Sequence, residues 1–568
     1  MKCVKCLKSK NLIRSHWDKN RGLHMSKEKK GALPRHPSNA PRSSEKILKD
    51  AKYKSYEWAN DPVIGESMFR EYDLRAPCVT LKKGGKEIPA AINPDGMRVL
   101  GQAYGTYARS VLRQNKIVVS NDYRSYSRGL AYAFMAGALS SGVDVIDIGV
   151  AITPILFFAQ HRFNLPGGAM VTASHNDNGW CGLKLAKDLS STFEPEDIAS
   201  FKELTYSGKF LTGAGNYERY NGIKDDYAGY VVGLQKGGIG RRLKVVVSTA
   251  NGGGGAFLPD ILSMLGFDVV KVNCDLDWDF PRFNPNTEDI TFLHDLGNAV
   301  LKNHADLGIG TDGDGDRMGV VDENGKEVFS DRAGLFMARC LSETVKGKPV
   351  VIDVKSTGAY AVDPVLKRNN CDVIFSKTGH SYVKAATHRH DALMGVEKSG
   401  HIYLRNGFGQ DYDDGCLAAV LFCTLLSKRP KSLSELIAEQ APSFQSPTMS
   451  AQVSDDKAKY EIAEKVAAEL KSLAAAGKEF AGQRIKEIIT INGIRVVLAD
   501  GSWGLVRASS NQPVLTIVVE SFGTRKEMYD IFDSLQERLE KHGVRRDNYD
   551  QLLPAYDGES GVVVGNRA

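Results

Sequence analysis

Cysteine is scarce in this sequence, with nine among 568 residues. That number is odd and too small for a disulfide-stapled fold, so we expect a reducing compartment and a cytoplasmic location. Cys3 and Cys6 form a C-x-x-C pair, but no second pair lies nearby to complete a four-ligand zinc site. Long apolar runs are also missing, because none approaches the roughly 18 residues of a membrane-spanning helix. We therefore expect no membrane partner.

An excess of one charge sign is confined to the start of the chain. Residues 1–50 hold 14 Lys and Arg against 4 Asp and Glu, whereas the other residues hold 60 against 64. The net charge of +6 therefore does not belong to the folded body, and we expect no nucleic-acid partner. Residues 1–54 also lack the apolar core of a secretory signal, so we predict a basic and mostly disordered extension.

Short β-branched runs alternate with helix-length segments from about residue 60 onward. The runs lie at 117–119, 143–148, 245–247, 350–354 and 372–375. This alternation predicts open α/β sheets with parallel strands and helices on both faces. In such sheets the ligand binds in loops at the carboxyl ends of the strands.

The sequence pattern changes after residue 445. A helical pattern at 457–475 comes first, and polar turns then separate three β-rich runs at 487–492, 494–498 and 514–520. A second helical pattern at about 526–539 closes the unit. This order predicts a separate, smaller α+β domain.

A glycine-rich segment, Gly252–Gly255, connects the run at 245–247 with a helical stretch that ends near Leu265. It has two interpretations, a phosphate-binding loop and a structural turn. The spacing does not match G-x-G-x-x-G with a following acidic residue, and no G-K-[ST] is present here. We therefore favour the structural turn.

A loop rich in polar residues follows the apolar run at 168–171 and contains Ser174, His175 and Lys184. A serine hydroxyl is a weak nucleophile unless a base or a metal ion activates it. His175 is adjacent in sequence, so its ring need not face the hydroxyl of Ser174. The same residue types are common in ordinary turns, and this loop alone does not decide between a catalytic and a structural role.

Three carboxylates, Asp312, Asp314 and Asp316, alternate with glycine after another apolar run. Carboxylates at every second position, with no side chain between them, can surround a hard divalent cation. An EF-hand is the alternative, but its sixth position, which needs glycine, is Arg317, and a β-rich run follows. We therefore predict a magnesium-type site, with Arg317 beside it to bind a phosphate or a carboxylate.

Two later loops, 377–380 and 397–401, each follow a β-rich run and contain the Glu, Ser and His side chains that bind sugar hydroxyls. A single histidine is more often structural, so either loop alone is a weak signal. Residues 505–513 combine one Arg, two Ser and the amide of Asn511 in a predicted turn between strands, which could bind an anion. All these features together indicate phosphoryl transfer on a sugar phosphate.

In this order the loops resemble those of the α-D-phosphohexomutase superfamily, and most closely its bacterial phosphomannomutase/phosphoglucomutase branch. The resemblance covers about residues 65–550. Its motifs are F-R-E-Y-D-L-R at 69–75, the segment 122–127, T-A-S-H-N at 172–176 with Lys184, D-G-D-G-D-R at 312–317, D-V-K at 353–355, K-T-G-H at 377–380 and E-K-S-G-H at 397–401. In the turn at 505–513, Ser510 and Asn511 stand where the family usually has G-T or N-T.

The resemblance implies a heart-shaped, four-domain architecture around a central cleft, with three related α/β domains that contain mixed sheets and a C-terminal α+β domain. The boundaries we expect are 1–54 for the extension, 55–221 for domain I with the phosphoserine loop, 222–326 for domain II with the metal loop, 327–441 for domain III with the sugar-reading loop, 442–556 for domain IV with the phosphate-binding loop, and 557–568 for a tail.

The resemblance also implies roles for the site residues. Ser174 would carry the phosphoryl group and, with Asp312, Asp314 and Asp316, hold one Mg²⁺ per chain. The other catalytic residues it implies are Arg75, His175, Lys184, Arg317, His380 and His401. The substrate-binding residues it implies are Lys355, Lys377, Thr378, Gly379, Glu397, Ser399, Arg507, Ser509, Ser510 and Asn511.

The implied activity is the interconversion of hexose 1-phosphate and hexose 6-phosphate, with mannose, glucose or both as the sugar. It would proceed through the phosphoserine and a hexose 1,6-bisphosphate, which is also the expected activator. We expect sugar phosphates as the only partners of a monomer or dimer. Three alternatives stay open: a phosphoglucosamine-type mutase, a phosphatase with an Asp nucleophile, and a non-catalytic sugar-phosphate-binding relative.

Overall fold

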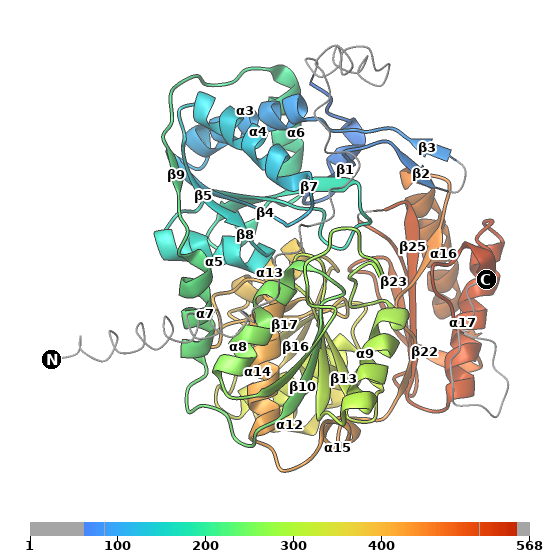
Figure 1. The fold of residues 1–568 in the computed structure, drawn as a ribbon. Coiled ribbons are helices and arrows are strands. Elements are labelled where there is room, and N and C mark those ends of the chain that lie inside the picture. Colours follow the sequence, from blue (N-terminus) through green and yellow to red (C-terminus); the bar gives the residue numbers. More distant parts are fainter. Residues whose placement is uncertain (1–61, 84–85, 511, 554–568) are drawn as a thin grey trace, which may run out of the picture.

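The computed structural model describes residues 62–83, 86–510 and 512–553. The predicted N-terminal extension, its C-x-x-C pair, Asn511 and the predicted tail at 557–568 lie outside the described residues. No helix in the described ranges is both long enough and apolar enough to cross a bilayer. Four separate sheets with their helices make up the body of the chain (Figure 1).

The first sheet is mixed, with the strand order β1-β7-β6-β4-β5-β9 and with β8 paired to β7. Strand β7 is antiparallel to both β1 and β6, whereas β4, β5, β6 and β9 run parallel. In Figure 1, α3, α4 and α6 lie on one face of this sheet and α5 on the other. The strands are β1 (Leu74–Pro77), β4 (Lys116–Asn121), β5 (Asp144–Val150), β6 (Gly168–Val171), β7 (Trp180–Asp188), β8 (Ser191–Thr192) and β9 (Tyr217–Arg219). The helices are α3 (Pro94–Ser110), α4 (Ser127–Ser140), α5 (Thr153–Phe163) and α6 (Pro195–Ser207), and β2 (Leu81–Lys83) pairs with β3 (Lys86–Ile88) as a small hairpin.

The second and third sheets share one pattern, in which three parallel strands are followed by an antiparallel strand. The second has the order β11-β10-β12-β13-β14, and the third has the order β16-β15-β17-β18. The second unit contains α7 (Ile223–Leu234), β10 (Lys244–Ser248), α8 (Leu258–Met264), β11 (Asp268–Val272), α9 (Ile290–Asn303), β12 (Leu307–Thr311), β13 (Met318–Asp322) and β14 (Glu327–Val328). The third contains α10 (Ser330–Ser342), β15 (Val350–Asp353), α11 (Ala359–Val362), α12 (Pro364–Arg368), β16 (Val373–Ser376), α13 (His380–Arg389), β17 (Met394–Val396), β18 (Ile402–Leu404), α14 (Gly415–Ser427) and α15 (Leu433–Ala438).

The fourth sheet is antiparallel, with the order β19-β25-β24-β23-β22-β21 and with β20 paired to β25. Helices α16 and α17 cover its outer side (Figure 1). The elements are β19 (Phe444–Gln445), β20 (Met449–Gln452), α16 (Asp456–Ala475), β21 (Glu479–Phe480), β22 (Gln483–Ile489), β23 (Ile494–Leu498), β24 (Trp503–Ala508), β25 (Val514–Ser521) and α17 (Arg525–Glu540). Short 3₁₀ turns lie at Glu66–Met68, Gly253–Ala256 and Arg546–Asn548.

Strand β24 corrects one prediction, because residues 505–508 were expected in a turn and instead lie in this strand. All six residues of β24 are buried between β23 and β25. Burial on both faces removes the polar–apolar alternation that marks a strand in sequence, and Gly504 interrupts the run of β-forming residues. Arg507 is therefore on a strand, and only the residues after Ala508 form the turn.

The fourth unit has its own apolar core and docks onto the third through buried polar groups. The carboxylate of Glu520 accepts hydrogen bonds from Trp503 Nε1 (2.5 Å), Thr357 Oγ1 (2.6 Å) and Gly358 N (2.8 Å). The guanidinium of Arg495 lies 3.6 Å from the Trp503 ring and donates to two backbone carbonyls of residues 354–356. The segment after β15 is thus held by the fourth unit.

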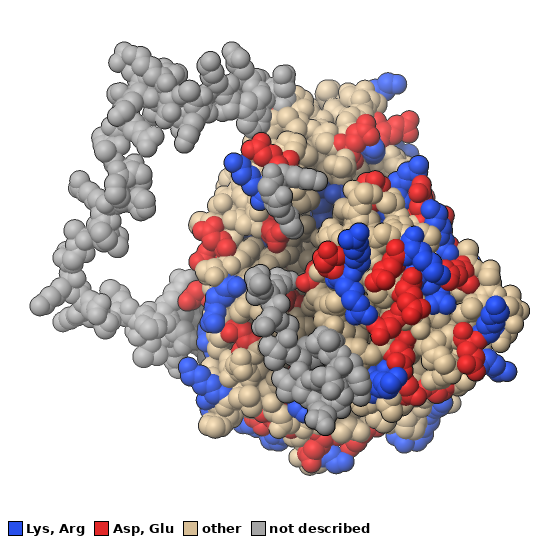
Figure 2. Space-filling model, turned by 90° about the vertical axis from the view of Figure 1, so that its right-hand side faces the viewer, with Lys and Arg blue, Asp and Glu red and all other residues tan. Residues whose placement is uncertain are grey.

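The outward face of the fourth unit carries both charge signs. Figure 2 shows Lys and Arg side chains interleaved with Asp and Glu on this face. Neighbouring pairs include Lys541 with Glu469 (3.0 Å) and Lys526 with Asp530 (2.7 Å), both exposed. Exposed pairs of this kind contribute little stability.

Candidate active site

One cleft of about 190 Å³ is lined by residues from all four units. It gathers nearly all the predicted site residues outside the aspartate loop: Arg75, Ser174, His175, Lys184, Arg317, Lys355, Thr378, Gly379, His380, Glu397, Ser399, His401, Arg507, Ser509 and Ser510. Lys377 differs from the rest, because it is exposed and its Nζ lies over the ring of Tyr382, 5.3 Å from the centroid. Its predicted substrate contact stays a prediction.

Three site loops occupy equivalent positions in the three related sheets. Each lies between the last parallel strand and the antiparallel strand that follows: Ser174 between β6 and β7, Asp312–Asp316 between β12 and β13, and Glu397–His401 between β17 and β18. The repeated topology therefore presents three different loops to one cleft.

Ser174 sits in a tightly held turn with a left-handed backbone conformation, at φ 52°. Such a conformation is uncommon for a residue other than glycine and needs support from its surroundings. Ser174 N donates to Thr172 Oγ1 (2.9 Å), and Arg124 donates to the Ser174 carbonyl (3.1 Å). Asp122 Oδ2 in turn accepts from Thr172 Oγ1 (2.8 Å) and Ala173 N (3.2 Å). Asp122 and Arg124 belong to the motif at 122–127, but sequence reasoning gave them no role.

The His175 ring does face the Ser174 hydroxyl, with Nδ1 3.2 Å from Oγ. Burial, together with the positive charges of Arg317, Arg75 and Lys184, lowers the pKa of His175 well below its usual range. The ring is therefore neutral near pH 7, and Nδ1 can accept the proton of the hydroxyl. Adjacency in sequence left this orientation open, and the turn at Ser174 decides it.

The three aspartates are fully buried, and ligand oxygens from them lie within 4.8 Å of one another. The protein fixes one oxygen of each: Arg317 N donates to Asp312 Oδ1 (3.3 Å), and Lys184 Nζ donates to Asp314 Oδ2 (2.8 Å) and to Asp316 Oδ2. The second oxygen of each carboxylate accepts no hydrogen bond from any described residue. Buried polar atoms without partners are rare.

These free oxygens fit a divalent cation. Burial and the neighbouring charges of Asp316 and Asp314 raise the pKa of Asp312 well above its usual range, and a bound Mg²⁺ would offset this repulsion. The Ser174 loop is in contact with the aspartate loop, because a Cβ placed on Gly313 would lie 2.6 Å from the Ser174 carbonyl oxygen. Asp312, Asp314 and Asp316 are thus the residues that would hold the ion, and the predicted contact of Ser174 with it stays a prediction.

Gly252–Gly255 packs beneath the aspartate loop, in agreement with a structural turn. Gly253 N donates to the Gly313 carbonyl (2.9 Å), and a Cβ on Gly254 would lie 2.3 Å from Thr311 Oγ1. Any side chain there would displace the loop that carries the aspartates.

The loops of the third unit are fixed by hydrogen bonds within that unit. Thr378 Oγ1 donates to Asp353 Oδ2 (2.8 Å). The Glu397 carboxylate accepts from Gly379 N (2.9 Å) and Tyr403 OH (2.8 Å), and burial raises its pKa. Glu397 therefore holds the two predicted sugar-binding loops together while its side chain lines the cleft.

Arg507 and the turn after it approach the cleft from the fourth unit. The guanidinium donates to Ser510 Oγ (3.3 Å), and its Nε is buried with no hydrogen-bond partner among the described residues. Ser509 and Gln512 line the same part of the cleft. A guanidinium with unused donors beside two hydroxyls suits an oxyanion such as a phosphate.

Comparison with known proteins gives the same domain order. Four segments match successive domains described as phosphoglucomutase/phosphomannomutase: alpha/beta/alpha domain I at residues 68–212, alpha/beta/alpha domain II at 229–325, alpha/beta/alpha domain III at 330–444 and the C-terminal domain at 452–538. This confirms the predicted architecture of three related α/β domains and a C-terminal α+β domain.

Curated relatives agree over most of the chain. The phosphomannomutase/phosphoglucomutase of Pseudomonas putida is 30% identical over 480 residues, which are 84% of this chain and 97% of the relative. The phosphoglucomutase/phosphomannomutase of Thermococcus kodakarensis is 31% identical over 449 residues, 77% of this chain and 92% of the relative. The chain belongs to the phosphoglucomutase/phosphomannomutase family. This confirms the resemblance seen in the sequence.

A solved member of this phosphoglucomutase/phosphomannomutase family has a closely similar structure. The protein from Burkholderia thailandensis, described as a phosphoglucomutase/phosphomannomutase family protein, matches with a TM-score of 0.72 at 26% identity. The match covers 84% of this chain and 98% of that one. The arrangement of all four domains is therefore shared with that protein.

Several residues of the phosphoglucomutase/phosphomannomutase cleft escaped sequence reasoning. Glu288 Oε1 lies 3.1 Å from Lys355 Nζ, and Oε2 lies 3.8 Å from Arg317 Nη1. Burial alone would raise the pKa of Glu288, but these two cations lower it to about 2. Tyr72, inside the motif at 69–75, packs edge-on against His380 at 4.7 Å. Only Tyr72 carried a signal, because its motif was recognised.

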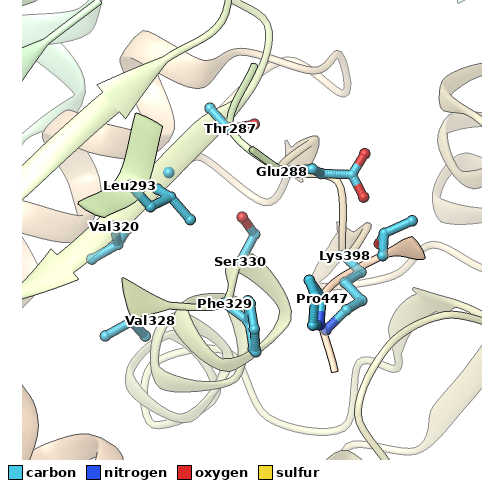
Figure 3. Close-up of a pocket in the computed structure, with 11 residues that line it drawn as sticks. Thr287, Glu288, Leu293, Val320, Val328, Phe329, Ser330, Lys398 and Pro447 are labelled. Carbon is cyan, nitrogen blue, oxygen red and sulfur yellow. The ribbon is translucent and has the colours of Figure 1, made fainter. Parts of the chain in front are cut away.

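A small cavity of about 10 Å³ lies next to the cleft, where the second, third and fourth units meet. Figure 3 shows Thr287, Glu288, Ser330, Lys398 and Pro447 around it. This volume admits about one water molecule. The cavity is therefore a small packing gap between the units, and it is too small to hold a sugar.

Proposed function

We propose that this protein is a phosphohexomutase that interconverts the 1- and 6-phosphates of mannose, glucose or both. It would work through a phosphoserine at Ser174 and a hexose 1,6-bisphosphate. The observation that carries the proposal is one cleft in which a serine loop packs on a three-aspartate loop, with Arg507 facing it from a separate unit. The names of the relatives at about 30% identity support the same activity.

The first transfer moves the phosphoryl group from Ser174 to the free hydroxyl of the sugar phosphate. The Oγ–P bond breaks as the hydroxyl oxygen forms the new O–P bond, and the proton that the sugar hydroxyl loses is balanced by the one that Ser174 Oγ takes up. The bisphosphate then reorients, so that the other phosphate faces Ser174. In the second transfer Ser174 Oγ takes that phosphoryl group and gives its proton to His175 Nδ1, which lies 3.2 Å away, while the sugar oxygen whose O–P bond breaks takes up a proton and becomes a hydroxyl.

The cleft supplies charge where the transferring phosphoryl group needs it. Lys184 and Arg317 are buried cations at the two sides of the aspartate loop. A bound Mg²⁺ would supply further charge compensation. Preorganised positive charge of this kind lowers the barrier for phosphoryl transfer. The phosphate that does not react would stay with Arg507, Ser509 and Ser510, so that either isomer binds in one way.

Turnover with added activator tests the proposal directly. Purified protein with Mg²⁺ and a trace of glucose 1,6-bisphosphate should convert glucose 1-phosphate to glucose 6-phosphate. Parallel rates on mannose 1-phosphate and glucosamine 1-phosphate should rank the sugars, with the hexosamine the slowest. Release of inorganic phosphate without isomerisation would favour the Asp-nucleophile phosphatase. Tight binding without any turnover would favour a non-catalytic relative.

Arg507 gives a prediction for the phosphate-binding turn. Arg507→Ala removes charge-assisted hydrogen bonds to the non-reacting phosphate, each worth about 1.5–3 kcal/mol. We therefore expect kcat/KM for glucose 1-phosphate to fall about 10- to 100-fold. The matched control is Arg546→Ala on the same domain, where the exposed arginine pairs with Asp533 at 2.5 Å. Equal kinetics for the two variants would exclude Arg507 from the phosphate site.

We also propose a cytoplasmic monomer or dimer whose partners are sugar phosphates. All seven described cysteines are free, which suits a reducing compartment. The cleft is lined by all four units of one chain, so a second copy is not needed to complete it. Sedimentation of the purified protein would give the oligomeric state.

A further inference from the structure

The turn that carries Ser174 is held by one buried guanidinium. Arg124 has only 1% of its side chain exposed. It donates to the carbonyls of Ser174 (3.1 Å), Asn176 (2.5 Å) and Asp177 (3.0 Å). Asp122 Oδ2 lies 3.4 Å from Arg124 Nε and balances its charge. The course of the backbone from 174 to 177 therefore depends on where the guanidinium lies.

An irregular connection of the second unit covers this guanidinium. Residues 273–289, between β11 and α9, form neither helix nor strand, and connections longer than about 15 residues without such elements are usually functional. The ring centroid of Phe280 lies 5.0 Å from Arg124 Cζ. An aromatic ring next to a desolvated guanidinium stabilises its position. Phe280 itself has φ 47°, a left-handed conformation that a bulky residue adopts only where its surroundings enforce it.

The same connection also forms hydrogen bonds with the Ser174 loop. Asn284 Nδ2 donates to the carbonyl of His175, and Asp279 Oδ1 accepts from Asn178 Nδ2 (3.2 Å). The first of these bonds fixes the backbone of the residue whose Nδ1 lies 3.2 Å from Ser174 Oγ. The second unit therefore holds the serine loop at both of these points.

We propose that Phe280 and Asn284 are positioning residues for the mutase reaction, which hold the Ser174 loop in its reactive geometry. Neither is among the described residues that line the cleft, so both act through the loop. Phe280 acts through Arg124, and Asn284 acts through the His175 carbonyl. The aspartate loop belongs to the same unit, so the connection also fixes Ser174 relative to the three carboxylates. The role in turnover rests on the proposed function, but the support of the loop does not.

Removal and replacement of the aromatic ring test Phe280. Phe280→Leu should lower kcat about 10- to 100-fold, because displacing a catalytic group by about 1 Å can cost this much. KM for glucose 1-phosphate should change little, because Arg507 lies on the fourth unit. Phe280→Tyr keeps a ring beside Arg124 and should restore most of the activity. Phe444→Leu is the matched control, since that exposed ring also lies by an arginine, Arg525, at 5.4 Å, and it should keep wild-type kinetics. A Phe280→Leu enzyme as fast as wild type, or a Phe280→Tyr enzyme equally slow, would overturn the proposal.

Asn284→Ala tests the second contact. Loss of the donor to the His175 carbonyl should lower kcat and leave KM nearly unchanged, as for Phe280→Leu. The matched control is Asn303→Ala, which removes another half-buried amide of the second unit that donates to a backbone carbonyl, that of Ala299 (2.8 Å). Equal kcat values for the two alanine variants would remove Asn284 from the proposal.

Hydrogen exchange separates this proposal from the proposed function. Ser174 N donates to Thr172 Oγ1 (2.9 Å) and Asn176 N donates to the Ala173 carbonyl (3.0 Å), so both amides report on the turn. In the full-length protein, a peptide covering 172–178 should exchange about tenfold faster in Phe280→Leu and Asn284→Ala, and at the wild-type rate in both controls. Unchanged exchange in the two variants would refute the inference even in an active enzyme. Faster exchange in a protein without mutase activity would leave the support of the loop correct and refute the function.

Discussion

Replacing Ser174 with alanine should abolish mutase activity, with a fall in kcat of about 10⁴-fold or more. The proposed reaction passes through a covalent bond to Ser174 Oγ, so no other group of the cleft can substitute for it. The hydroxyl is also the atom that His175 Nδ1 faces at 3.2 Å. Substrate binding should persist, because Arg507 and the sugar-binding loops lie on other units.

The matched control for this change is Ser207→Ala. Ser207 is exposed at the end of α6 in the same domain, where its hydroxyl donates to the Leu204 carbonyl (2.8 Å) and accepts from Lys209 N (3.2 Å). That variant should keep wild-type kinetics. Intact-mass measurement gives an independent readout: wild type incubated with glucose 1,6-bisphosphate should gain one phosphoryl group, which Ser174→Ala should not. A phosphoryl group on an aspartate instead would establish the phosphatase alternative.

The sequence predicted the local parts of this site well, because each is a short motif at the end of a strand. The predicted run at 168–171 coincides with β6, and the loop after it does carry Ser174 to the cleft. The alternation of Asp and Gly at 312–316 likewise predicted a cation site. In the structure, one oxygen of each of these carboxylates accepts no hydrogen bond from a described residue. Both predictions depended on residues close together in the chain.

What the sequence could not supply are contacts between residues far apart. Glu288 approaches Lys355 only because the second and third units pack together, and Asp413 reaches His401 across a loop with no motif of its own. Strand β24 was missed because both of its faces are buried. Tertiary packing produced each of these features, and no local pattern encodes it.

Asp312→Asn should lower activity and stabilise the metal-free protein at the same time. Three buried carboxylates repel one another, and burial with Asp316 and Asp314 raises the pKa of Asp312. A raised pKa in the folded state means that ionising this carboxyl costs more free energy in the folded protein than in the unfolded chain. At pH 7, far above the pKa of the unfolded chain, this charge therefore lowers the free energy of unfolding. Asparagine removes that charge and should raise the Tm measured in EDTA.

The same substitution removes a proposed ligand of Mg²⁺, whose charge stabilisation of phosphoryl transfer is worth several kcal/mol, or about 10³-fold in kcat. Wild type stripped with EDTA should therefore lose activity, regain it with Mg²⁺ and gain Tm on adding the ion, whereas Asp312→Asn should show neither response. Asp295→Asn changes a half-buried partner of the exposed Arg282 at 3.1 Å; it is the control and should respond as wild type does. A variant that is less stable in EDTA, or fully active with Mg²⁺, would show that the carboxylate serves the fold and not the ion.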